Sequence, residues 1–371
     1  MMISLFGSKV GCEEMQEIQS SIEQQWLGIG KKCADFESMM AKRLRINDFV
    51  MVNSGSNALL LAVKLFNLPQ GSEVILPSYT WVSCAHAIVL NGLKPVFCDV
   101  DLDTCNISRK HIEPLITSKT KAIMIVHYAG KPVGMQDIMD LGFPVIEDAA
   151  HAVDSKINEK YCGTIGDIGI YSFDAVKNLT TADGGGVVSR RDDFVKYARS
   201  IRYCGIAKSG FDTSKNTGRW WEHNIVDFFP KVIPNDICAS IGIGQLKKLD
   251  EFQDYRKRIW EKYDKAFSKV SWLNIPKGPD KNEQHSYFTY FIRLNNDKRD
   301  ALARYLYAQG IYTSVRYHPL HLNKIYKTDT CLRNCEKLNE TALNIPLHPN
   351  LSAADVEKVI SEIKNFGKQY C

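Results

Sequence analysis

The sequence predicts an α/β fold, with a large domain built on a mostly parallel sheet between helices and a smaller C-terminal α+β domain. Between about residues 50 and 190, short apolar runs rich in β-branched residues alternate with helical patterns, which is typical of βαβ units. The runs are continuously apolar, as strands buried on both faces of a parallel sheet are. A long helical pattern then leads into a shorter segment that contains one strand pattern and two helical patterns.

In the large domain we expect one helix over residues 59–66 and five buried strands. The strands are residues 73–76, 95–98, 121–126, 144–146 and 168–173. The segment 208–219 is rich in Ser, Gly, Asp, Thr and Asn, so we expect an exposed loop there.

A long helix is expected from near Asp236 to about Phe267, long enough to lead from the first domain into the second. Beyond it, residues 287–294 predict a strand, and residues 298–309 and 353–366 predict helices. We therefore expect a large domain at residues 1–245 and a small domain, which includes the linking helix, at residues 246–371.

Composition excludes several classes of protein. The net charge of +5 is small for 371 residues, and Lys and Arg are interspersed with Asp and Glu, which argues against a nucleic-acid surface. No apolar run approaches the roughly 20 residues that cross a bilayer, and the N-terminus lacks the pattern of a signal peptide. Eleven scattered cysteines without a CxxC pair favour reduced thiols, so we expect a cytoplasmic protein without nucleic-acid or membrane partners.

The first of four candidate site features is Asn53-Ser-Gly-Ser-Asn-Ala58, directly before a helical run. Small residues such as Gly55 and Ser56 let the backbone approach a ligand closely, and the free N–H groups of a helix N-terminus favour a phosphate. A Ser N-cap on a core helix explains the same residues without any ligand.

The second feature is Trp81, which lies just past the strand that ends near Pro77. Loops after the carboxyl ends of parallel strands are where α/β proteins bind ligands. The flat indole could stack on an aromatic cofactor ring, although a Trp at such a position also suits the core.

The third feature is Val145-Ile-Glu-Asp-Ala-Ala-His151, whose strand delivers Asp148 to the same edge of the sheet. A carboxylate beside a pyridinium nitrogen keeps that nitrogen protonated. At about 4 Å and an effective dielectric near 20, the Coulomb energy of such a pair is about 4 kcal/mol. His151 could contact the ring oxygen or the substrate. A helix cap at Asp148 and a surface histidine are the structural alternatives.

The fourth feature is Ser172-Phe-Asp-Ala-Val-Lys177, followed by Gly184-Gly-Gly186. A primary amine just past an apolar strand can form an imine with an aldehyde cofactor, and glycines permit a sharp turn close to its ring. A merely solvated Lys177 is the alternative, because most lysines are exposed.

Together the four features resemble the nucleotide-sugar aminotransferases of the DegT/StrS family, which are fold-type I enzymes that use pyridoxal 5′-phosphate (PLP). The similarity lies in SGSNALLLAV, ILPSYTWVSCAHAIVLNGLKPVFCDVD, VHYAGKPVGM, EDAAHA, GDIGIYSFDAVKNLTTADGGGVV and IGIGQLKKLD. It covers nearly the whole chain, from about Trp26 to Pro349.

The resemblance implies a role for each matching position. Lys177 would be the Schiff-base lysine and the proton shuttle, and Asp148 would hold the pyridine nitrogen. The remaining cofactor contacts would be phosphate binding by Ser172 and by the backbone around Gly55, Ser56 and Asn57, stacking by Trp81, and a contact of His151 near the ring hydroxyl.

The resemblance also implies the reaction. Glutamate would give its amino group and leave as 2-oxoglutarate, and a keto group on a nucleotide-linked sugar would then accept the amine, for amino-sugar or surface-glycan biosynthesis. Lys177, once free, would act as general acid and base.

Two further expectations concern positions around the cofactor. Where many relatives have an Asn that reaches the cofactor phosphate of the neighbouring subunit, this chain has Lys231, and lysine can bind a phosphate, so we expect a homodimer with composite active sites. The stretch Tyr317-His-Pro-Leu-His321 resembles a segment near the sugar pocket, which makes His318 and His321 candidate substrate contacts. A zinc pair explains these histidines less well, since no third ligand is evident nearby, and we expect no metal.

Two other functions stand as alternatives. A PLP-dependent sugar dehydratase has the same fold and cofactor, but such relatives have histidine where this chain has Lys177, so the lysine favours transamination. A PLP-binding regulator without turnover belongs to a different class of protein. The presence of Lys177, Asp148 and the phosphate site argues against it.

Overall fold

A seven-stranded sheet with strand order β1-β9-β8-β5-β4-β2-β3 is the centre of the computed structural model, which describes residues 2–208, 223–295 and 297–370. Five neighbouring strands, from β8 to β3, run parallel, and β9 and β1 are antiparallel to their neighbours at one edge. All five predicted strands are present, so the predicted mostly parallel sheet is confirmed. The bounds are β1 (Val50–Val52), β2 (Glu73–Pro77), β3 (Lys94–Cys98), β4 (Thr120–Val126), β5 (Val145–Asp148), β8 (Ile168–Ser172) and β9 (Gly185–Ser189). Residues 209–219 of the expected polar loop lie outside the described residues.

The sequence patterns do not predict β9, and its glycines are the reason. A Cβ atom on Gly186 would lie 1.9 Å from the ring of Phe49, and one on Gly185 would lie 2.4 Å from the backbone oxygen of Ser54. Glycine therefore lets this strand approach Phe49 and the start of the next helix closely. The same glycines weaken the strand signal in the sequence.

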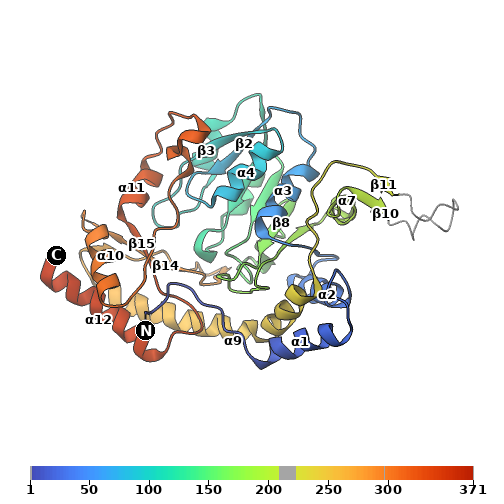
Figure 1. Cartoon of the computed structure of the whole chain (residues 1–371). Coiled ribbons are helices and arrows are strands. Elements are labelled where there is room, and N and C mark those ends of the chain that lie inside the picture. The colour runs from blue at the N-terminus through green and yellow to red at the C-terminus, as the bar shows by residue number, and fades with distance from the viewer. Residues whose placement is uncertain (1, 209–222, 296, 371) are drawn as a thin grey trace.

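Helices pack around the large sheet (Figure 1). The apolar run predicted as a helix at residues 59–66 belongs to α3, which begins earlier, at Gly55, and ends at Leu65. The N-terminal part of the chain forms two helices that the sequence patterns do not predict. The bounds are α1 (Cys12–Glu23), α2 (Lys31–Leu44), α3 (Gly55–Leu65), α4 (Val82–Leu90), α5 (Arg109–Ile112), α6 (Met135–Met139) and α7 (Asp192–Ile201).

The long helix α9 (Asp236–Phe267) has the bounds that the sequence predicts. Asn235 caps its N-terminus, because the side-chain oxygen accepts the backbone N–H of Cys238 at 2.9 Å. Figure 1 shows α9 running from α1 and α2 at one end to the C-terminal helices at the other. The proposed domain boundary at residue 245 lies inside this helix. Within the described ranges, none of the helices combines the length and the apolar character that crossing a membrane requires.

The C-terminal segment forms a second, three-stranded antiparallel sheet with its own apolar core. The strand predicted at residues 287–294 begins later, at Tyr290, because Tyr287 has a φ of 51° and the chain bends there. The closing helix extends past residue 366 to Tyr370. The bounds are β12 (Leu273–Asn274), β14 (Tyr290–Leu294), β15 (Ala342–Ile345), α10 (Arg299–Ala308), α11 (Arg333–Thr341) and α12 (Ala353–Tyr370).

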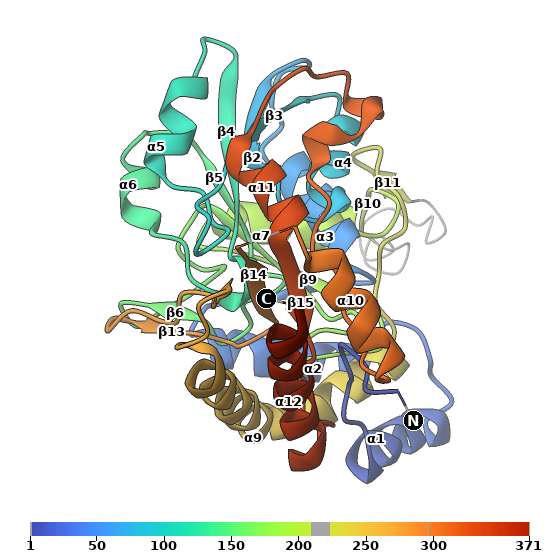
Figure 2. The same ribbon diagram turned by 90° about the vertical axis from the view of Figure 1, so that its left-hand side faces the viewer.

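The described residues also form two small sheets. One pairs β10 (Ile206–Lys208) with β11 (Asn224–Ile225). The other contains β6 (Lys156–Ile157), β7 (Lys160–Tyr161) and β13 (Glu283–Gln284), and Figure 2 shows β6 and β13 beside each other above α9. The β13–β6 pairing therefore attaches the start of the C-terminal segment to the large domain.

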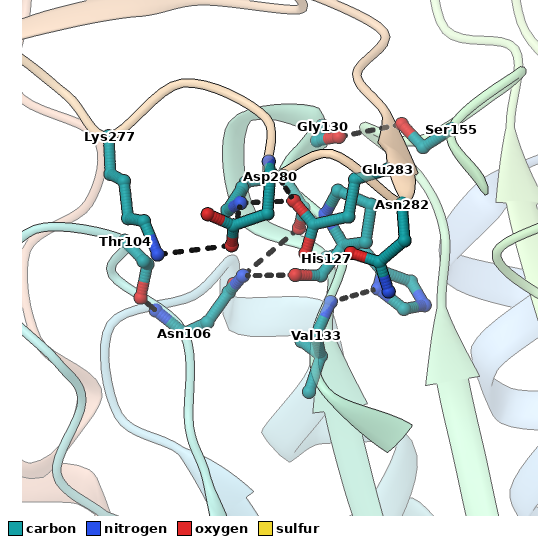
Figure 3. A network of polar contacts seen from close by, with 12 residues as sticks. Thr104, Asn106, His127, Gly130, Val133, Ser155, Lys277, Asp280, Asn282 and Glu283 are labelled. Atoms are coloured by element: carbon teal, nitrogen blue, oxygen red, sulfur yellow. Dashed lines mark hydrogen bonds and ion pairs between the residues drawn. The ribbon is translucent and has the colours of Figure 1, made fainter. Parts of the chain in front are cut away.

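A network of polar contacts reinforces this attachment, and Figure 3 shows Lys277, Asp280 and Glu283 within it. The buried ammonium of Lys131 forms an ion pair with Glu283 and one with Asp280 at 3.1 Å, and Lys277 also pairs with Asp280, at 3.0 Å. The backbone oxygen of Lys131 accepts from the side chain of Asn106 at 3.0 Å. These contacts fix residues 277–283 against the loop that follows β4.

The segment that follows β13 is held in the same way. Ser286 donates its hydroxyl to the backbone oxygen of His151 at 2.6 Å, and the backbone N–H of Phe288 donates to the oxygen of Ala129 at 3.0 Å. The ring of Phe288 is therefore brought to the edge of the large sheet where the predicted site residues lie.

Glu147 is fully buried and organises the turn at residues 163–166. Its carboxylate accepts the backbone N–H groups of Gly163 at 2.8 Å and Ile165 at 2.6 Å, and also that of Gly166. Nδ1 of His127 accepts the N–H of Val133 at 3.0 Å, so Nε2 carries the proton that is donated to Glu147 at 2.9 Å. One carboxylate thus accepts from four donors, of which that of Gly166 is partly buried.

We predict that Glu147→Ala lowers the free energy of unfolding by about 3 to 5 kcal/mol, because it leaves several buried N–H groups without an acceptor. Glu147→Gln should cost less, since the amide oxygen still accepts. Urea unfolding followed by circular dichroism measures both. The control is Glu357→Ala, which removes an exposed carboxylate whose ion pair with Lys262 is 3.6 Å long and is worth about 1 kcal/mol or less. Equal losses for Glu147→Ala and the control would contradict this account of the turn.

Candidate active site

A cavity of about 690 Å³ opens at the carboxyl ends of β5 and β8. Ligands bind at this edge of parallel sheets, outside the ends of the strands. The cavity is lined by seven of the residues that the sequence singles out, namely Gly55, Ser56, Trp81, Asp148, His151, Ser172 and Lys177. Residues far apart in the chain are therefore brought to one place, as the sequence interpretation requires.

Lys177 lies in the loop between β8 and β9, and its amine faces the ring of Phe288 with Nζ 4.9 Å from the ring centroid. The pKa of this amine is lowered to about 8, mainly by burial and next by the charge of Arg316. The carboxylates of Asp148 and Asp174 and the thiol of Cys84 act in the opposite direction. An amine with this pKa is partly neutral near physiological pH, so it can act as a nucleophile and as a base.

Asp148 is the last residue of β5 and is buried. Because side chains alternate along a strand, Glu147 and Asp148 point to opposite faces of the sheet, one toward the turn and the other toward the cavity. One oxygen of Asp148 accepts the N–H of Ala150 at 2.9 Å, and the other lies 3.1 Å from Sγ of Cys84. Burial raises the pKa of Asp148, and no ion pair joins it to any residue in the described part of the chain. No helix begins at residues 149–151, so Asp148 is not a helix cap.

His151 is buried, not a surface residue. Its ring stacks on Phe288 with the centroids 4.1 Å apart, and Nε2 lies 3.0 Å from the hydroxyl of Tyr317. Burial lowers the pKa of His151 well below its usual value, so the ring is neutral. Nδ1 is buried and has no hydrogen-bond partner among the described residues, so it is available to a polar group in the cavity.

The N-terminus of α3 and the end of β8 form one small cradle. A Cβ atom on Gly55 would lie 2.6 Å from Cβ of Ser172, so only glycine allows this close approach. The hydroxyl of Ser56, at this terminus, lies 2.7 Å from that of Ser83, which is in the first turn of α4. Backbone N–H groups and hydroxyls gathered at a helix N-terminus favour an anion such as a phosphate.

The capping interpretation of this segment is also correct. Ser54 is the N-cap of α3 and accepts the backbone N–H of Asn57 at 3.2 Å. The side-chain amide of Asn57 donates to Asn53 at 2.8 Å, and Asn57 does not line the cavity. Gly55 and Ser56 therefore face the cavity, while the donors of Asn57 are engaged within the helix terminus.

Trp81 precedes α4 and remains 55% exposed although it lines the cavity. Its ring centroid lies 5.7 Å from that of Tyr317. A large ring at the mouth of a cavity, with one face open, can stack on an aromatic ligand. Trp81 is therefore not a core residue.

The sequence interpretation misses four residues of the site: Phe288, Ser83, Arg316 and Tyr317. Arg316 and Tyr317 line the cavity from the C-terminal segment, where the backbone N–H of Arg316 donates to the side-chain oxygen of Asn344 at 3.0 Å. The motif that begins at Tyr317 could have indicated these two residues. Its histidines, which the sequence interpretation selected, do not reach the cavity.

Besides Asn57, three more of the predicted contacts lie away from this cavity. Lys231 is exposed, and its Nζ lies 5.7 Å from the ring centroid of Tyr203. His318 is exposed, with Nδ1 3.2 Å from Oδ1 of Asn339. His321 is buried between the hydroxyl of Ser78 at 2.7 Å and the carboxylate of Glu336 at 3.3 Å. The cavity of a single chain therefore contains none of the three.

The residues of the cavity fit the groups of PLP. The cradle of Gly55, Ser56 and Ser172 suits a phosphate, and the buried carboxylate of Asp148 suits a protonated ring nitrogen. The unpartnered Nδ1 of His151 suits a polar ring substituent, and the amine of Lys177 suits an aldehyde. The cavity thus has a suitable residue for the phosphate, for the ring and for the reactive carbon of the cofactor.

Comparisons with known proteins agree with this assignment. Residues 9–364 match the model of the DegT/DnrJ/EryC1/StrS aminotransferase family. A protein from Saccharopolyspora spinosa, described as dTDP-4-dehydro-2,3,6-trideoxy-D-glucose 4-aminotransferase, is 37% identical over 370 residues, which are 98% of this chain and 96% of that protein.

Solved structures give the same result. The aminotransferase TlmJ from Streptoalloteichus hindustanus has a TM-score of 0.94 and 37% identity, with 100% of this chain and 99% of that chain covered. The PLP-form of Spr1654 from Streptococcus pneumoniae has a TM-score of 0.91 and 26% identity, with 100% of this chain and 99% of that chain covered.

We predict that, in protein stripped of any bound aldehyde, acylation of Lys177 rises with pH through a midpoint near 8, because only the neutral amine reacts. Arg316→Met should raise the midpoint, since it removes a cation that lowers the pKa of Lys177, and Asp148→Asn should lower it, since it removes an anion that raises the pKa. Peptide mass spectrometry across the pH range gives each midpoint, with N-acetyl-lysine amide as the reference amine. A midpoint near 10.5, the ordinary lysine pKa, would contradict the electrostatic account.

Proposed function

Because this chain belongs to the DegT/DnrJ/EryC1/StrS aminotransferase family, we propose that it transfers an amino group from glutamate to a keto group of a nucleotide-linked sugar. The chain is a PLP-dependent sugar aminotransferase by family and by its relatives. The observation that supports the reaction most directly is the presence of a buried amine, Lys177, and a buried carboxylate, Asp148, in one cavity with a phosphate cradle. The product would be an amino sugar for polysaccharide or glycan synthesis, made in the cytoplasm.

Gly55, Ser56 and Ser172 would hold the phosphate of PLP, and Trp81 would lie against its ring. When bound, PLP supplies a carbonyl carbon that exchanges amines and a protonated ring that accepts an electron pair. Asp148 would keep the ring nitrogen protonated through its negative charge, because pairing two opposite charges in a buried site stabilises both. His151 is neutral, and its Nδ1 would be available to a polar substituent of the ring.

Lys177 performs the proton transfers. Its lowered pKa leaves a neutral fraction that removes a proton from the carbon next to the donor nitrogen. In the second half of the reaction Lys177 returns a proton to the sugar carbon that receives the amine. Phe288 and Tyr317 cover the amine and the neighbouring imidazole, so bulk water has little access to them.

The test of this proposal uses the two halves of the reaction separately. Enzyme loaded with PLP is mixed with glutamate, and we expect one 2-oxoglutarate for each active site together with a loss of visible absorbance. Addition of nucleotide-linked 3-keto or 4-keto sugars should then give a product whose mass is that of the amino sugar. If PLP binds and no 2-oxoglutarate forms, the chain is not a glutamate-dependent transaminase and the regulator alternative gains support.

We predict that Asp148→Asn keeps its fold and some cofactor but loses on the order of a hundredfold or more in turnover, because a neutral amide does not hold the ring nitrogen protonated. Single-turnover rates with glutamate measure this loss. Asp137→Asn, on the exposed face of α6, is the control and should retain the rate of the unmodified enzyme. Turnover of Asp148→Asn within a few-fold of the control would mean that Asp148 is structural.

We further predict a homodimer in which Lys231 of one chain contacts the PLP phosphate held by the other. Lys231 lies outside the cavity of its own chain and is exposed, so its ammonium is available to a second chain. Each of Lys177→Ala and Lys231→Ala should be severely impaired alone, and mixing them should restore one site per heterodimer, which pairs intact Lys177 with intact Lys231. A monomer that is fully active, or mixed subunits that exchange without regaining activity, would refute the shared site.

A further inference from the structure

Arg316 lines the cavity, and contacts with other parts of the chain hold both its backbone and its guanidinium in place. Its backbone N–H is bound by the side chain of Asn344 at 3.0 Å, and its guanidinium carbon lies 3.8 Å from the ring centroid of Phe6. The same carbon is 5.7 Å from the centroid of Phe288. Stacking on aromatic faces fixes the plane of a guanidinium while its N–H groups stay free to bind an anion.

Within the described residues, the guanidinium of Arg316 has no carboxylate partner. No ion pair joins it to any residue of the described ranges, whereas Arg202, for comparison, is paired with Glu37 at 2.7 Å. A half-buried cation without a counter-ion repels its neighbours, and the charge of Arg316 lowers the pKa of both Lys177 and His151. An anion that binds to Arg316 would relieve this repulsion.

The position of Arg316 favours one of two substrate anions, the α-carboxylate of the amino donor over the diphosphate of the nucleotide-linked sugar. Arg316 and Lys177 lie over the same ring, 5.7 Å and 4.9 Å from the centroid of Phe288. In an α-amino acid the α-carboxylate is one carbon away from the amino nitrogen, so it must lie close to the lysine that moves the proton. The diphosphate of a nucleotide-linked sugar is separated from a reacting C3 or C4 carbon by the sugar ring.

We propose that Arg316 binds the α-carboxylate of the amino donor and that this contact couples donor binding to the protonation of Lys177. The proposal rests on the transaminase function proposed above. The planar fork of the guanidinium matches the two oxygens of a carboxylate. The bound carboxylate would offset the charge of Arg316 and so raise the pKa of Lys177. Lys177 would then be a stronger base when the donor is in place. Arg316 is thus a substrate-binding residue that also acts on the catalytic amine.

The first test separates the half-reactions. Arg316→Met should reduce kcat/KM for glutamate on the order of 10- to 100-fold, the effect expected for loss of a charge-assisted contact. In enzyme loaded with pyridoxamine phosphate, the half-reaction with a nucleotide-linked keto sugar should change by a clearly smaller factor, because the sugar has no α-carboxylate and only the effect of Arg316 on Lys177 is lost. Arg316→Lys should recover part of the loss. The matched control is Arg258→Met, an exposed arginine that also lies over an aromatic ring, 5.4 Å from Tyr255.

The outcomes of this test are distinct. Equal losses in both half-reactions would overturn the assignment, and a loss confined to the sugar half-reaction would assign Arg316 to the diphosphate instead. If the unmodified enzyme forms no 2-oxoglutarate, the proposed function fails, and the binding measurement that follows still decides the role of Arg316.

The second test measures binding and coupling without turnover. Glutarate, an unreactive dicarboxylate, is titrated by calorimetry into enzyme loaded with pyridoxamine phosphate, the form in which Lys177 is a free amine. We expect binding to the unmodified enzyme and to Arg258→Met, and binding on the order of 10- to 100-fold weaker to Arg316→Met.

Saturating glutarate should also raise the pH midpoint of Lys177 acylation in the unmodified enzyme. It should not do so in Arg316→Met, whose midpoint is already raised. Simple steric protection would slow acylation at every pH without moving the midpoint. Absence of glutarate binding to the unmodified enzyme, or equal binding and equal midpoints in the unmodified and Arg316→Met enzymes, would overturn the proposal.

Discussion

The loss of water around the amine of Lys177 is the constraint on which the chemistry of this site depends. Burial disfavours the ammonium form, and the nearby guanidinium of Arg316 disfavours it further, whereas Asp148 and Asp174 oppose the shift. The balance leaves a pKa of about 8, so one lysine can both attack a carbonyl and carry a proton. The carboxylate of Asp148 is subject to the same burial, which raises its pKa although the N–H of Ala150, the thiol of Cys84 and the charge of Lys177 act in the opposite direction.

The fold creates this environment through close backbone approaches. Parallel strands bring Asp148 and Ser172 to one edge of the sheet, and Gly55 allows the N-terminus of α3 to contact Ser172 directly. The buried network around Lys131 and Glu283 then holds the segment that contains Phe288 against the same edge. Neither part of the chain encloses the amine alone, so the site depends on the attachment between them.

Much of this arrangement is predictable from the sequence, because strand and helix patterns are local. The five apolar runs, the bounds of α9 and the positions of Lys177, Asp148 and Trp81 at strand ends follow from such patterns. The strand β9 does not, because Gly185 and Gly186 serve a tight contact at the expense of strand propensity. The places of Arg316 in the cavity and of Phe288 beside Lys177 and His151 do not follow from such patterns either, since they depend on tertiary contacts between distant segments. The histidines next to Tyr317 show the same limit: His318 and His321 lie in the right motif, but their side chains point to Asn339, Ser78 and Glu336.

The central claim is that Lys177 is the amine that holds the cofactor, and chemical trapping tests it most directly. Protein loaded with PLP is reduced with borohydride, which makes the link between amine and cofactor permanent, and the digested protein is mapped by mass spectrometry. The account predicts one reduced cofactor per chain, attached to the peptide that contains Lys177. Attachment to any other lysine, or the absence of a covalent label on protein that retains PLP, would contradict the account.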